Sequence, residues 1–281
     1  MSIQIVTDST CDLPQEMTAA LGVTVVPLYI HVGHESYLDG IDMSRQEFYQ
    51  RLPTFTNHPQ TASPGPEMFC ETYERLADEG ADEILSIHIA AALSGTFNTA
   101  QLGAEATDAV PVTVYDSGQL SVGTGFLVET AAALAAAGRS VAEIVEALTE
   151  RTKRTHLFAG LDTLEFLQRS GRMNWAVSKI GGLLRIKPLL TMHDGEAGVL
   201  KVRTTKHAMQ RLLDMLGELA PLEELALVHT NAPEKMRELR DRARHLFPEG
   251  KEPIQADVTP VIGAHIGPGA AGFACVSAPK R

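Results

Sequence analysis

The sequence contains little cysteine, and the cysteines form no motif. Cys11, Cys70 and Cys275 lie far apart in the 281 residues, with no C-x-x-C spacing. This pattern indicates neither a zinc ribbon nor a dithiol redox motif, so we expect three reduced, buried thiols. His31 and His34 have an H-x-x-H spacing, but no other ligands cluster with them. We therefore expect no bound metal.

Long hydrophobic runs and an excess of positive charge are also absent. The most apolar stretch, residues 125–137, is interrupted by Glu129 and is shorter than the ~20 residues of a membrane-spanning helix. Residues 1–6 start with a strand pattern and lack the basic region of an export signal. We expect a cytoplasmic protein with only transient membrane contact. The net charge of −11 argues against general nucleic-acid binding, because clustered Lys and Arg bind phosphate backbones.

The short motifs of nucleotide and acyl chemistry are missing as well. The sequence has no Walker A motif, no G-x-S-x-G elbow and no S-x-x-K motif. Residues 267–272 form a G-x-G-x-x-G pattern. A dinucleotide-binding unit needs an acidic residue about 20 positions later, and fewer residues than that remain. We therefore expect no cofactor.

What is present is the composition of a globular protein, with strand patterns that alternate with helix patterns. Hydrophobic residues make up 44% and charged residues 21% of the chain. At about 150 residues per domain, this length suggests two domains. The polar run at 151–154 breaks the apolar pattern between them. We expect an α/β protein with a parallel-sheet, Rossmann-like domain at 1–154 and a mixed-sheet α/β domain at 155–281.

The predicted strands and loops follow from local patterns. In the first domain, strands are predicted at 3–6, 23–30, 84–89 and 112–115, and the proline-rich residues 53–66 are predicted to form an extended loop. In the second domain, Asp194-Gly195 predicts a hairpin between 188–192 and 197–202. A short helix is predicted at 161–168, and further strands at 225–229 and 254–258.

Polar loops follow three predicted strands of the first domain. Their residues are Asp8-Ser9, Ser94-Gly95-Thr96 and Asp116-Ser117-Gly118. Ligands of open parallel sheets bind beyond the carboxyl ends of the strands, so these loops are predicted to face one crevice. The alternative for Ser94 is a helix cap. Thr61 and Ser63 supply two further hydroxyls beside Pro64, or a plain turn.

Two features of the second half also indicate ligand binding. His265 lies in a glycine-rich segment, which lets backbone and imidazole approach a ligand, although a lone histidine is more often structural. The second feature is an excess of basic residues between 169 and 211. They are Arg169, Arg172, Lys179, Arg185, Lys187, Lys201, Arg203, Lys206 and Arg211, against only Asp194 and Glu196. Such a segment suits an acidic partner or a phosphate, or it is a solvated face.

These residues together resemble the DegV family, bacterial proteins that bind a fatty acid and, where characterised, present it to a separate fatty-acid kinase. The resemblance covers essentially the whole chain. It rests on Thr7-Asp8-Ser9-Thr10 with Asp12-Leu13, Pro27-Leu28, Leu38-Asp39-Gly40, Ser94-Gly95-Thr96, Asp116-Ser117, Gly171-Arg172, Lys187-Pro188, Val202-Arg203 and His265-Ile266-Gly267-Pro268-Gly269.

The resemblance implies the DegV (EDD-like) fold and a role for particular residues. Thr61 and Ser94 would bind the carboxylate with His265 nearby, and the acyl chain would lie in a tunnel of the second domain. Ser63, Gly95 and Thr96 belong to the same site, with Asp8, Ser9, Asp116 and Ser117 in supporting loops.

The resemblance also concerns the partner and the head-group contacts. Arg203 matches the arginine that such proteins offer near the acyl phosphate and the kinase, and Arg172 falls in the same basic region. Alanines at 62 and 90–92 replace serines that are usual in the family, which changes secondary polar contacts to the head group.

We therefore expect a monomeric fatty-acid carrier that performs no chemistry itself and acts with a fatty-acid kinase. The rival class is an acyl hydrolase or transferase, with Ser94 as nucleophile, His265 as base and Asp8 or Asp116 as the residue that orients the base. A nucleotide or phosphosugar binder is a further alternative, and the absence of a phosphate loop argues against it.

Overall fold

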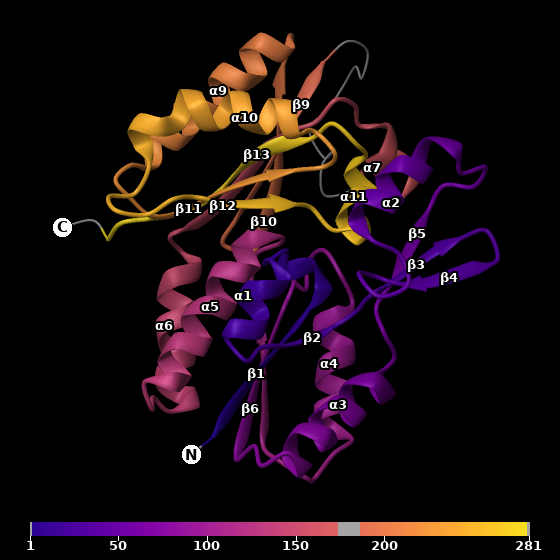
Figure 1. Ribbon diagram of the computed structural model, residues 1–281, viewed down its shortest axis with the longest axis vertical. Coiled ribbons are helices and arrows are strands. Elements are labelled where there is room, and N and C mark those ends of the chain that lie inside the picture. Colours follow the sequence, from indigo (N-terminus) through magenta and orange to yellow (C-terminus); the bar gives the residue numbers. More distant parts are fainter. Residues whose placement is uncertain (1, 174–185, 280–281) are drawn as a thin grey trace.

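The computed structural model describes residues 2–173 and 186–279, and its chain forms two large sheets and one small sheet (Figure 1). The first large sheet contains four parallel strands in the order β2-β1-β6-β7. These strands are β1 (Ile3–Asp8), β2 (Thr24–Val26), β6 (Glu83–His88) and β7 (Val112–Asp116). The predicted parallel sheet of the first domain is confirmed.

Helices cover both faces of this parallel sheet. They are α1 (Gln15–Ala20), α3 (Pro66–Asp78), α4 (Thr96–Glu105), α5 (Val122–Ala136) and α6 (Val141–Thr152). Successive residues of a strand point to opposite faces, so Ile5 packs with residues of α5 and α6, whereas Val6 packs with residues of α3 and α4. Because both faces of the sheet are covered, the strand sequences are nearly continuous apolar runs and do not alternate between apolar and polar residues.

The second large sheet has six strands and is mixed, as predicted. Its order is β10-β9-β8-β13-β11-β12, and only β11 and β12 are paired in parallel. The strands are β8 (Thr155–Gly160), β9 (Lys187–His193), β10 (Glu196–Val202), β11 (Leu222–His229), β12 (Ile254–Asp257) and β13 (Ala271–Ser277). The turn at Asp194-Gly195 joins β9 to β10, which confirms the predicted hairpin.

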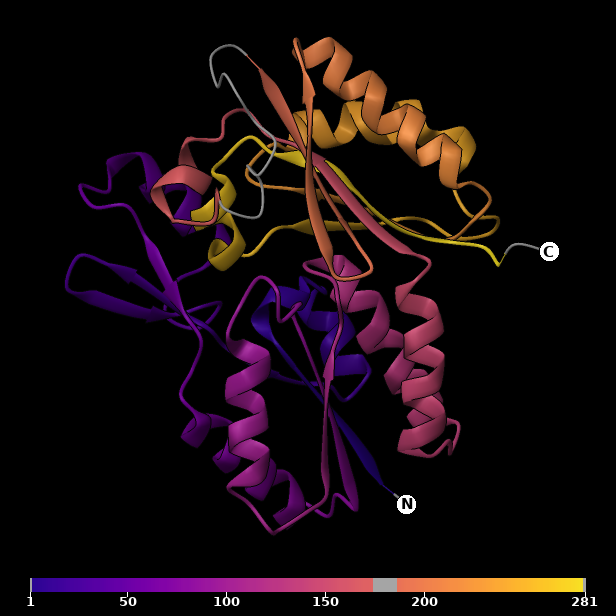
Figure 2. The same ribbon diagram turned by 180° about the vertical axis from the view of Figure 1, so that it is seen from behind.

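The two faces of the six-stranded sheet have different partners. Helices α9 (Thr205–Leu219) and α10 (Pro233–Ala243) cover one face. The other face is directed toward the parallel-sheet part, where Leu157, Met192 and Val228 share an apolar cluster with Val122 and Phe126 of α5. Figure 2 shows the same arrangement from behind, with α9 and α10 on the far side of the sheet from α5 and α6.

The structure differs from two predictions at the small sheet. Strand β3 (Tyr29–Val32) pairs with β4 (Glu35–Leu38) and with β5 (Gln60–Ala62). Residues 23–30, predicted as one strand, are therefore two strands in different sheets, divided at Pro27, which has no N–H for a sheet and a fixed φ. Residues 53–66 are not wholly a loop, because residues 60–62 add an edge strand to β3.

Helices α2 (Arg45–Arg51) and α11 (Pro260–Ile266) pack beside the small sheet.

Three further differences separate the structure from the sequence-based predictions. The helix predicted at 161–168 is α7 (Glu165–Arg169). Cys11 and Cys275 are buried, but Cys70 on α3 is only half-buried, and the strand β13 was not predicted. None of the described helices is both long and apolar enough to cross a membrane.

Candidate functional site

An apolar cavity lies between the loops of the parallel sheet and the inner face of the six-stranded sheet. Its apolar walls include residues from β8, β9, β10, β11 and α11: Leu157, Ala159, Leu190, Met192, Ala197, Val228, Ile262 and Ile266. Its polar lining includes Thr10, Thr61, Ser63, Ser94, Ser121, Thr191, Arg172 and His265. The cavity therefore offers a mostly apolar surface with a few hydroxyls, the Arg172 guanidinium and the imidazoles of His229 and His265.

Two of the predicted residues meet directly although they are far apart in sequence. The Thr61 hydroxyl, on β5, lies 2.9 Å from Nε2 of His265, on α11. Both side chains are half-buried and line the cavity. This contact joins the small sheet of the first part of the chain to a helix near its end.

His265 is an uncharged imidazole at neutral pH. Burial lowers the pKa of His265 to about 3, and the charges of Arg172 and His58 act in the same direction. The Nδ1 atom is buried and has no hydrogen-bond partner among residues 2–173 and 186–279. A neutral imidazole has one N–H and one acceptor nitrogen. In the tautomer in which Nε2 carries the proton and donates to Thr61, the Thr61 hydroxyl keeps its own proton for a ligand oxygen.

The other hydroxyls form a chain beside this pair. Thr96 Oγ1 lies 3.0 Å from Ser63 Oγ and 2.8 Å from Ser94 Oγ. Thr96 itself is buried, whereas Ser63 and Ser94 are half-buried and line the cavity with Gly95. The structure thus brings Thr61, His265 and this hydroxyl chain to one cavity, with Thr96 behind it.

Ser94 does not cap the following helix in the expected way. Gly95 is the N-cap of α4, and it has no side chain to bond the helix N–H groups. Ser94 Oγ nevertheless accepts the Thr96 N–H at 3.3 Å. The alternative of Ser94 as the N-cap residue is therefore displaced by one position, because α4 begins at Thr96 and its N-cap is Gly95.

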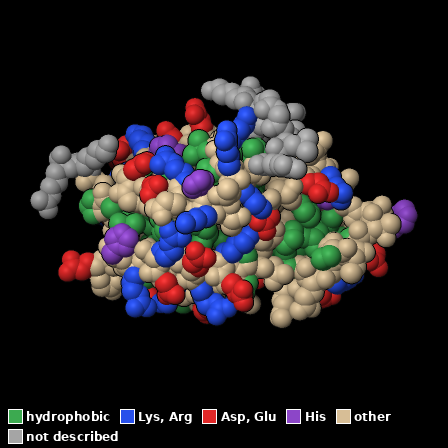
Figure 3. Space-filling view, turned by 90° about the horizontal axis from the view of Figure 1, so that it is seen from above, with side chains coloured by type: hydrophobic (Ala, Val, Ile, Leu, Met, Phe, Trp, Pro, Cys, Tyr) green, Lys and Arg blue, Asp and Glu red, His purple; other side chains and the backbone are tan. Residues whose placement is uncertain are grey.

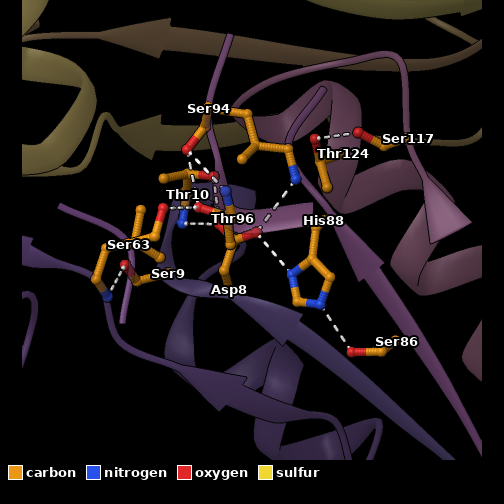
Figure 4. A network of polar contacts seen from close by, with 12 residues as sticks. Asp8, Ser9, Thr10, Ser63, Ser86, His88, Ser94, Thr96, Ser117 and Thr124 are labelled. Atoms are coloured by element: carbon orange, nitrogen blue, oxygen red, sulfur yellow. Dashed lines mark hydrogen bonds and ion pairs between the residues drawn. The ribbon is translucent and has the colours of Figure 1, made fainter. Parts of the chain in front are cut away.

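Asp8 lies beneath the cavity in a buried network of polar side chains (Figure 4). Its Oδ1 accepts the Thr10 N–H at 3.0 Å, and its Oδ2 accepts the Ile89 N–H at 3.1 Å and lies 3.0 Å from Nδ1 of His88. Burial by itself raises the pKa of Asp8, but the hydrogen bonds and charge of His88, with those from Thr10 and Ile89, lower it below the usual range. Asp8 therefore fixes Thr10 and Ile89, which line the cavity.

His88 and Ser86 complete this network, and neither was singled out from the sequence. His88 Nε2 lies 2.7 Å from Ser86 Oγ, which accepts the Tyr73 hydroxyl at 2.9 Å. All three side chains are buried. The available signal was the placement of polar residues at alternate positions of the apolar strand 84–89, so that both point to the same face.

The other supporting loops lie near the cavity without lining it. Ser9 Oγ accepts the Leu28 N–H at 3.2 Å. Asp116 Oδ1 accepts the N–H groups of Ala91 and Gly118 at 3.1 and 2.9 Å. The buried Ser117 hydroxyl lies 3.1 Å from Thr124 Oγ1. These side chains connect loops to one another, and of the three predicted loops the one at Ser94 lines the cavity.

The basic residues of 169–211 are dispersed rather than gathered into one site. Arg172 lines the cavity and donates to the Ser170 carbonyl at 2.9 Å. Arg203 is exposed just after β10 and does not line the cavity. Lys179 and Arg185 lie outside the described residues. Seen from above, Lys and Arg side chains alternate with Asp and Glu over this end of the molecule (Figure 3).

Among residues 2–173 and 186–279, no histidine, aspartate or glutamate side chain forms a hydrogen bond with the Ser94 hydroxyl, as a base for a serine nucleophile would. The described partner of its hydroxyl is Thr96, whereas His265 contacts Thr61 and His88 contacts Asp8 and Ser86. Within residues 2–173 and 186–279, no three His, Cys, Asp or Glu side chains are placed to share a metal ion. The described geometry therefore suits noncovalent binding at the mouth of an apolar cavity.

Comparison with known proteins agrees with the fold and with the predicted resemblance. Residues 2–278 match the model of a family described as uncharacterised protein, DegV family. A DegV domain-containing protein of Streptomyces coelicolor is 38% identical over 96% of both chains, and one of Listeria innocua is 36% identical over 96% of this chain and 97% of its own.

Two solved structures are similar over the whole chain. A fatty-acid-binding DegV family protein from Thermus thermophilus superposes with a TM-score of 0.89 at 34% identity, over 99% of this chain and 100% of its own. DegV of Bacillus subtilis, a fatty acid binding protein, superposes with a TM-score of 0.90 at 29% identity over the same shares. With the match over residues 2–278, these likenesses show that the chain belongs to the DegV family.

Proposed function

We propose that this protein binds a long-chain fatty acid, with the acyl chain in the apolar cavity and the carboxylate at Thr61, Ser94 and His265. The observation that supports this most strongly is the composition of the cavity, which joins apolar walls to hydroxyls and an uncharged imidazole. The similar proteins from Thermus thermophilus and Bacillus subtilis are described as binding fatty acids.

The carboxylate contacts follow from the two polar groups of the cavity. Thr61 and His265 form one pair, and the half-buried Ser94 is one end of the hydroxyl chain that includes Thr96 and Ser63. Gly95 has no side chain to block access, and the N-terminus of the ten-residue helix α4 follows it. Helix N-termini favour negative charge, so a carboxylate beside Ser94 gains from both the hydroxyl and the helix.

The acyl chain and the carboxylate contribute unequally to the binding free energy. At about 0.8 kcal/mol for each buried CH₂, a chain of ~16 carbons gains on the order of 12 kcal/mol before the costs of association. A hydrogen bond to a charged group contributes about 1.5–3 kcal/mol. The tail therefore supplies most of the affinity, and Thr61, Ser94 and His265 fix which end of the ligand faces outward.

The cavity is smaller than a long acyl chain. Its volume is about 140 Å³, and a cavity of ~150 Å³ engineered in another protein binds benzene. A chain of ~16 carbons is larger, so we infer that its binding displaces side chains of the walls. Met192 is suited to this, because an unbranched thioether has several rotatable bonds and adapts to irregular space.

We also propose that the bound fatty acid is presented to a separate fatty-acid kinase, and that this chain needs no metal or cofactor. The exposed Arg203 would contact the kinase or the acyl phosphate, and Arg172 lies nearer the carboxylate, in the cavity lining. In this proposal the protein acts as a cytoplasmic monomer that meets the membrane only transiently.

The competing function is a serine acyl hydrolase or transferase that uses Ser94. The contacts of Ser94 with Thr96, and of His265 with Thr61, argue for an anchor rather than a nucleophile. A serine-reactive phosphonate separates the two functions. We expect no covalent label at Ser94 while delipidated protein takes up palmitate in a calorimetric titration. Stoichiometric labelling of Ser94 would favour the enzyme, and no uptake of palmitate would contradict the carrier.

A further inference from the structure

A second buried polar cluster lies where loops of the parallel sheet meet the start of α11. Its centre is Asp12, which is 1% exposed. Asp12 Oδ1 accepts the Thr259 N–H at 2.8 Å and lies 3.2 Å from Nη1 of Arg45. Asp12 Oδ2 accepts the Ser121 hydroxyl at 2.5 Å. One carboxylate therefore joins three segments that are distant in sequence.

Other contacts fix the same end of α11. Thr259 is the N-cap residue of this helix, and its hydroxyl donates to Asp39 Oδ2. The Tyr49 hydroxyl donates to the Val258 carbonyl at 2.9 Å. A Cβ at position 263 would overlap the Tyr49 hydroxyl, so Gly263 lets α11 lie against α2. Figure 1 shows these two helices side by side.

Ser121 connects the cluster to the cavity. It lines the cavity wall and precedes α5 with φ 54° and ψ −144°, a region that few residues other than glycine adopt. Such a conformation persists where surrounding contacts impose it, and its hydrogen bond to Asp12 is such a contact. Asp12 is thus bonded both to a wall of the cavity and to the residue that starts the His265 helix.

We propose that Asp12 is a positioning residue of the head-group site, which places α11 so that His265 lies against Thr61. Asp12 does not line the cavity and acts through Thr259 and Ser121. Its consequence for ligand affinity rests on the proposed fatty-acid binding, whereas its effect on α11 does not.

The charges of the cluster give this role a measurable signature. Two carboxylates, Asp12 and Asp39, face one guanidinium, that of Arg45. The other titratable groups around them are Asp8, Cys11, Tyr49 and Asp257. Burial raises the pKa of Asp12 to about 7, although Arg45 and the hydrogen bonds from Ser121 and Thr259 act to lower it.

The sign of the pH dependence follows from that pKa. When α11 detaches, Asp12 meets water and its pKa returns toward its usual value of 3.8. The attached state then binds the proton more tightly than the detached state. The contribution of Asp12 to attachment is greatest at low pH, falls as the pH rises toward 7, and levels off above 7. This contribution alone gives about a tenfold difference in detachment between pH 6 and pH 8. His265 acts in the opposite direction, because its pKa is lowered to about 3 while α11 is attached and returns toward 6.5 on detachment.

Hydrogen exchange of the ligand-free protein tests this by comparison with Asp12→Asn, which keeps the shape but cannot ionise. The protection of amides 261–266, corrected for the intrinsic exchange rate, is measured at pH 6 and pH 8. The ratio of the two values should be about tenfold higher in the natural protein than in the variant, because His265 contributes equally to both proteins. Helix α9 serves as the internal reference and should show the same ratio in both proteins. The same ratio for α11 in both proteins would overturn the proposal.

Palmitate titration then tests the link to the ligand. Asp12→Ala removes the acceptor for Thr259 and Ser121 and should weaken palmitate binding about tenfold, whereas Asp12→Asn, which retains an oxygen for the Thr259 N–H, should restore most of the affinity. The exposed Asp108→Ala is the matched control. A folded Asp12→Ala protein with undiminished affinity contradicts the proposal. If natural protein binds no palmitate, the proposed function fails, and the exchange data still decide the role of Asp12.

Discussion

Thr61 and His265 show what a single residue can and cannot reveal from sequence. Each residue type was identified as a candidate, but their contact across 204 positions follows from the tertiary structure. Ser94 was identified too, and its partner Thr96 lies two residues away. The buried Asp8–His88 pair was only half predicted, because His88 lies within an apolar strand whose pattern gives no sign of a partner on the neighbouring strand.

Replacing Thr61 by valine tests the head-group contact. The substitution keeps the shape and removes the hydroxyl, so palmitate should bind about 1.5–3 kcal/mol more weakly, or about ten- to hundredfold in Kd. Calorimetry of delipidated protein measures this change. Thr72→Val on α3 is the matched control, since the Thr72 hydroxyl donates to the Met68 carbonyl of its own helix and lies outside the cavity lining. Equal loss of affinity in both variants would exclude a specific role for Thr61.

Helices and strands with strong local patterns could be predicted from the sequence, whereas the pairing of strands from distant segments could not. The parallel strands and the hairpin at Asp194-Gly195 follow from apolar runs and turn residues. The strand at 60–62 is short and, among the described strands, pairs with β3 alone, so its edge position has no local signature. The division of 23–30 depends on which sheet accepts each half, and Pro27 marks the place without specifying the partners.

The inner face of the β9–β10 hairpin gives a prediction about the acyl chain. Ala197 pairs with Met192 across the hairpin, and both line the cavity. Ala197→Phe places a ring in the space proposed for the tail, so palmitate affinity should fall by at least about tenfold, the equivalent of about two buried CH₂ groups. Fluorescence displacement of a bound fatty-acid probe measures the loss.

The control for this variant lies on the same strand. Leu200 points to the opposite face and is 40% exposed, so Leu200→Phe should bind palmitate as the natural protein does. An Ala197→Phe protein that folds and keeps its affinity would place the acyl chain elsewhere.

The whole molecule encloses its cavity between parts contributed by both halves of the chain. Residues 61–63 and 94–95 come from the first half, and the inner face of the six-stranded sheet and α11 come from the second. The sequence predicted both sheets and several of the polar residues that line the cavity. It did not predict the apolar walls, because small and branched apolar residues of many strands look alike until the sheets face each other.

Arg203 is exposed just after β10 and lies outside the cavity lining, so its proposed role concerns the contact of the whole protein with a partner. Arg203→Ala should lower the rate at which a fatty-acid kinase phosphorylates the bound ligand, by about tenfold if one charge pair is lost, while palmitate affinity stays within about twofold. Arg237→Ala, on the exposed side of α10, is the control. Equal loss of binding and phosphorylation in Arg203→Ala would contradict separate sites for ligand and partner.

Mass spectrometry shows whether a fatty acid occupies the cavity. Protein purified without added lipid is measured intact under native conditions and then extracted with organic solvent. We expect one long-chain fatty acid per chain, and its loss in a Thr61→Val, Ala197→Phe double variant. The absence of any acyl chain in the extract, together with no uptake of palmitate by delipidated protein, would contradict this expectation.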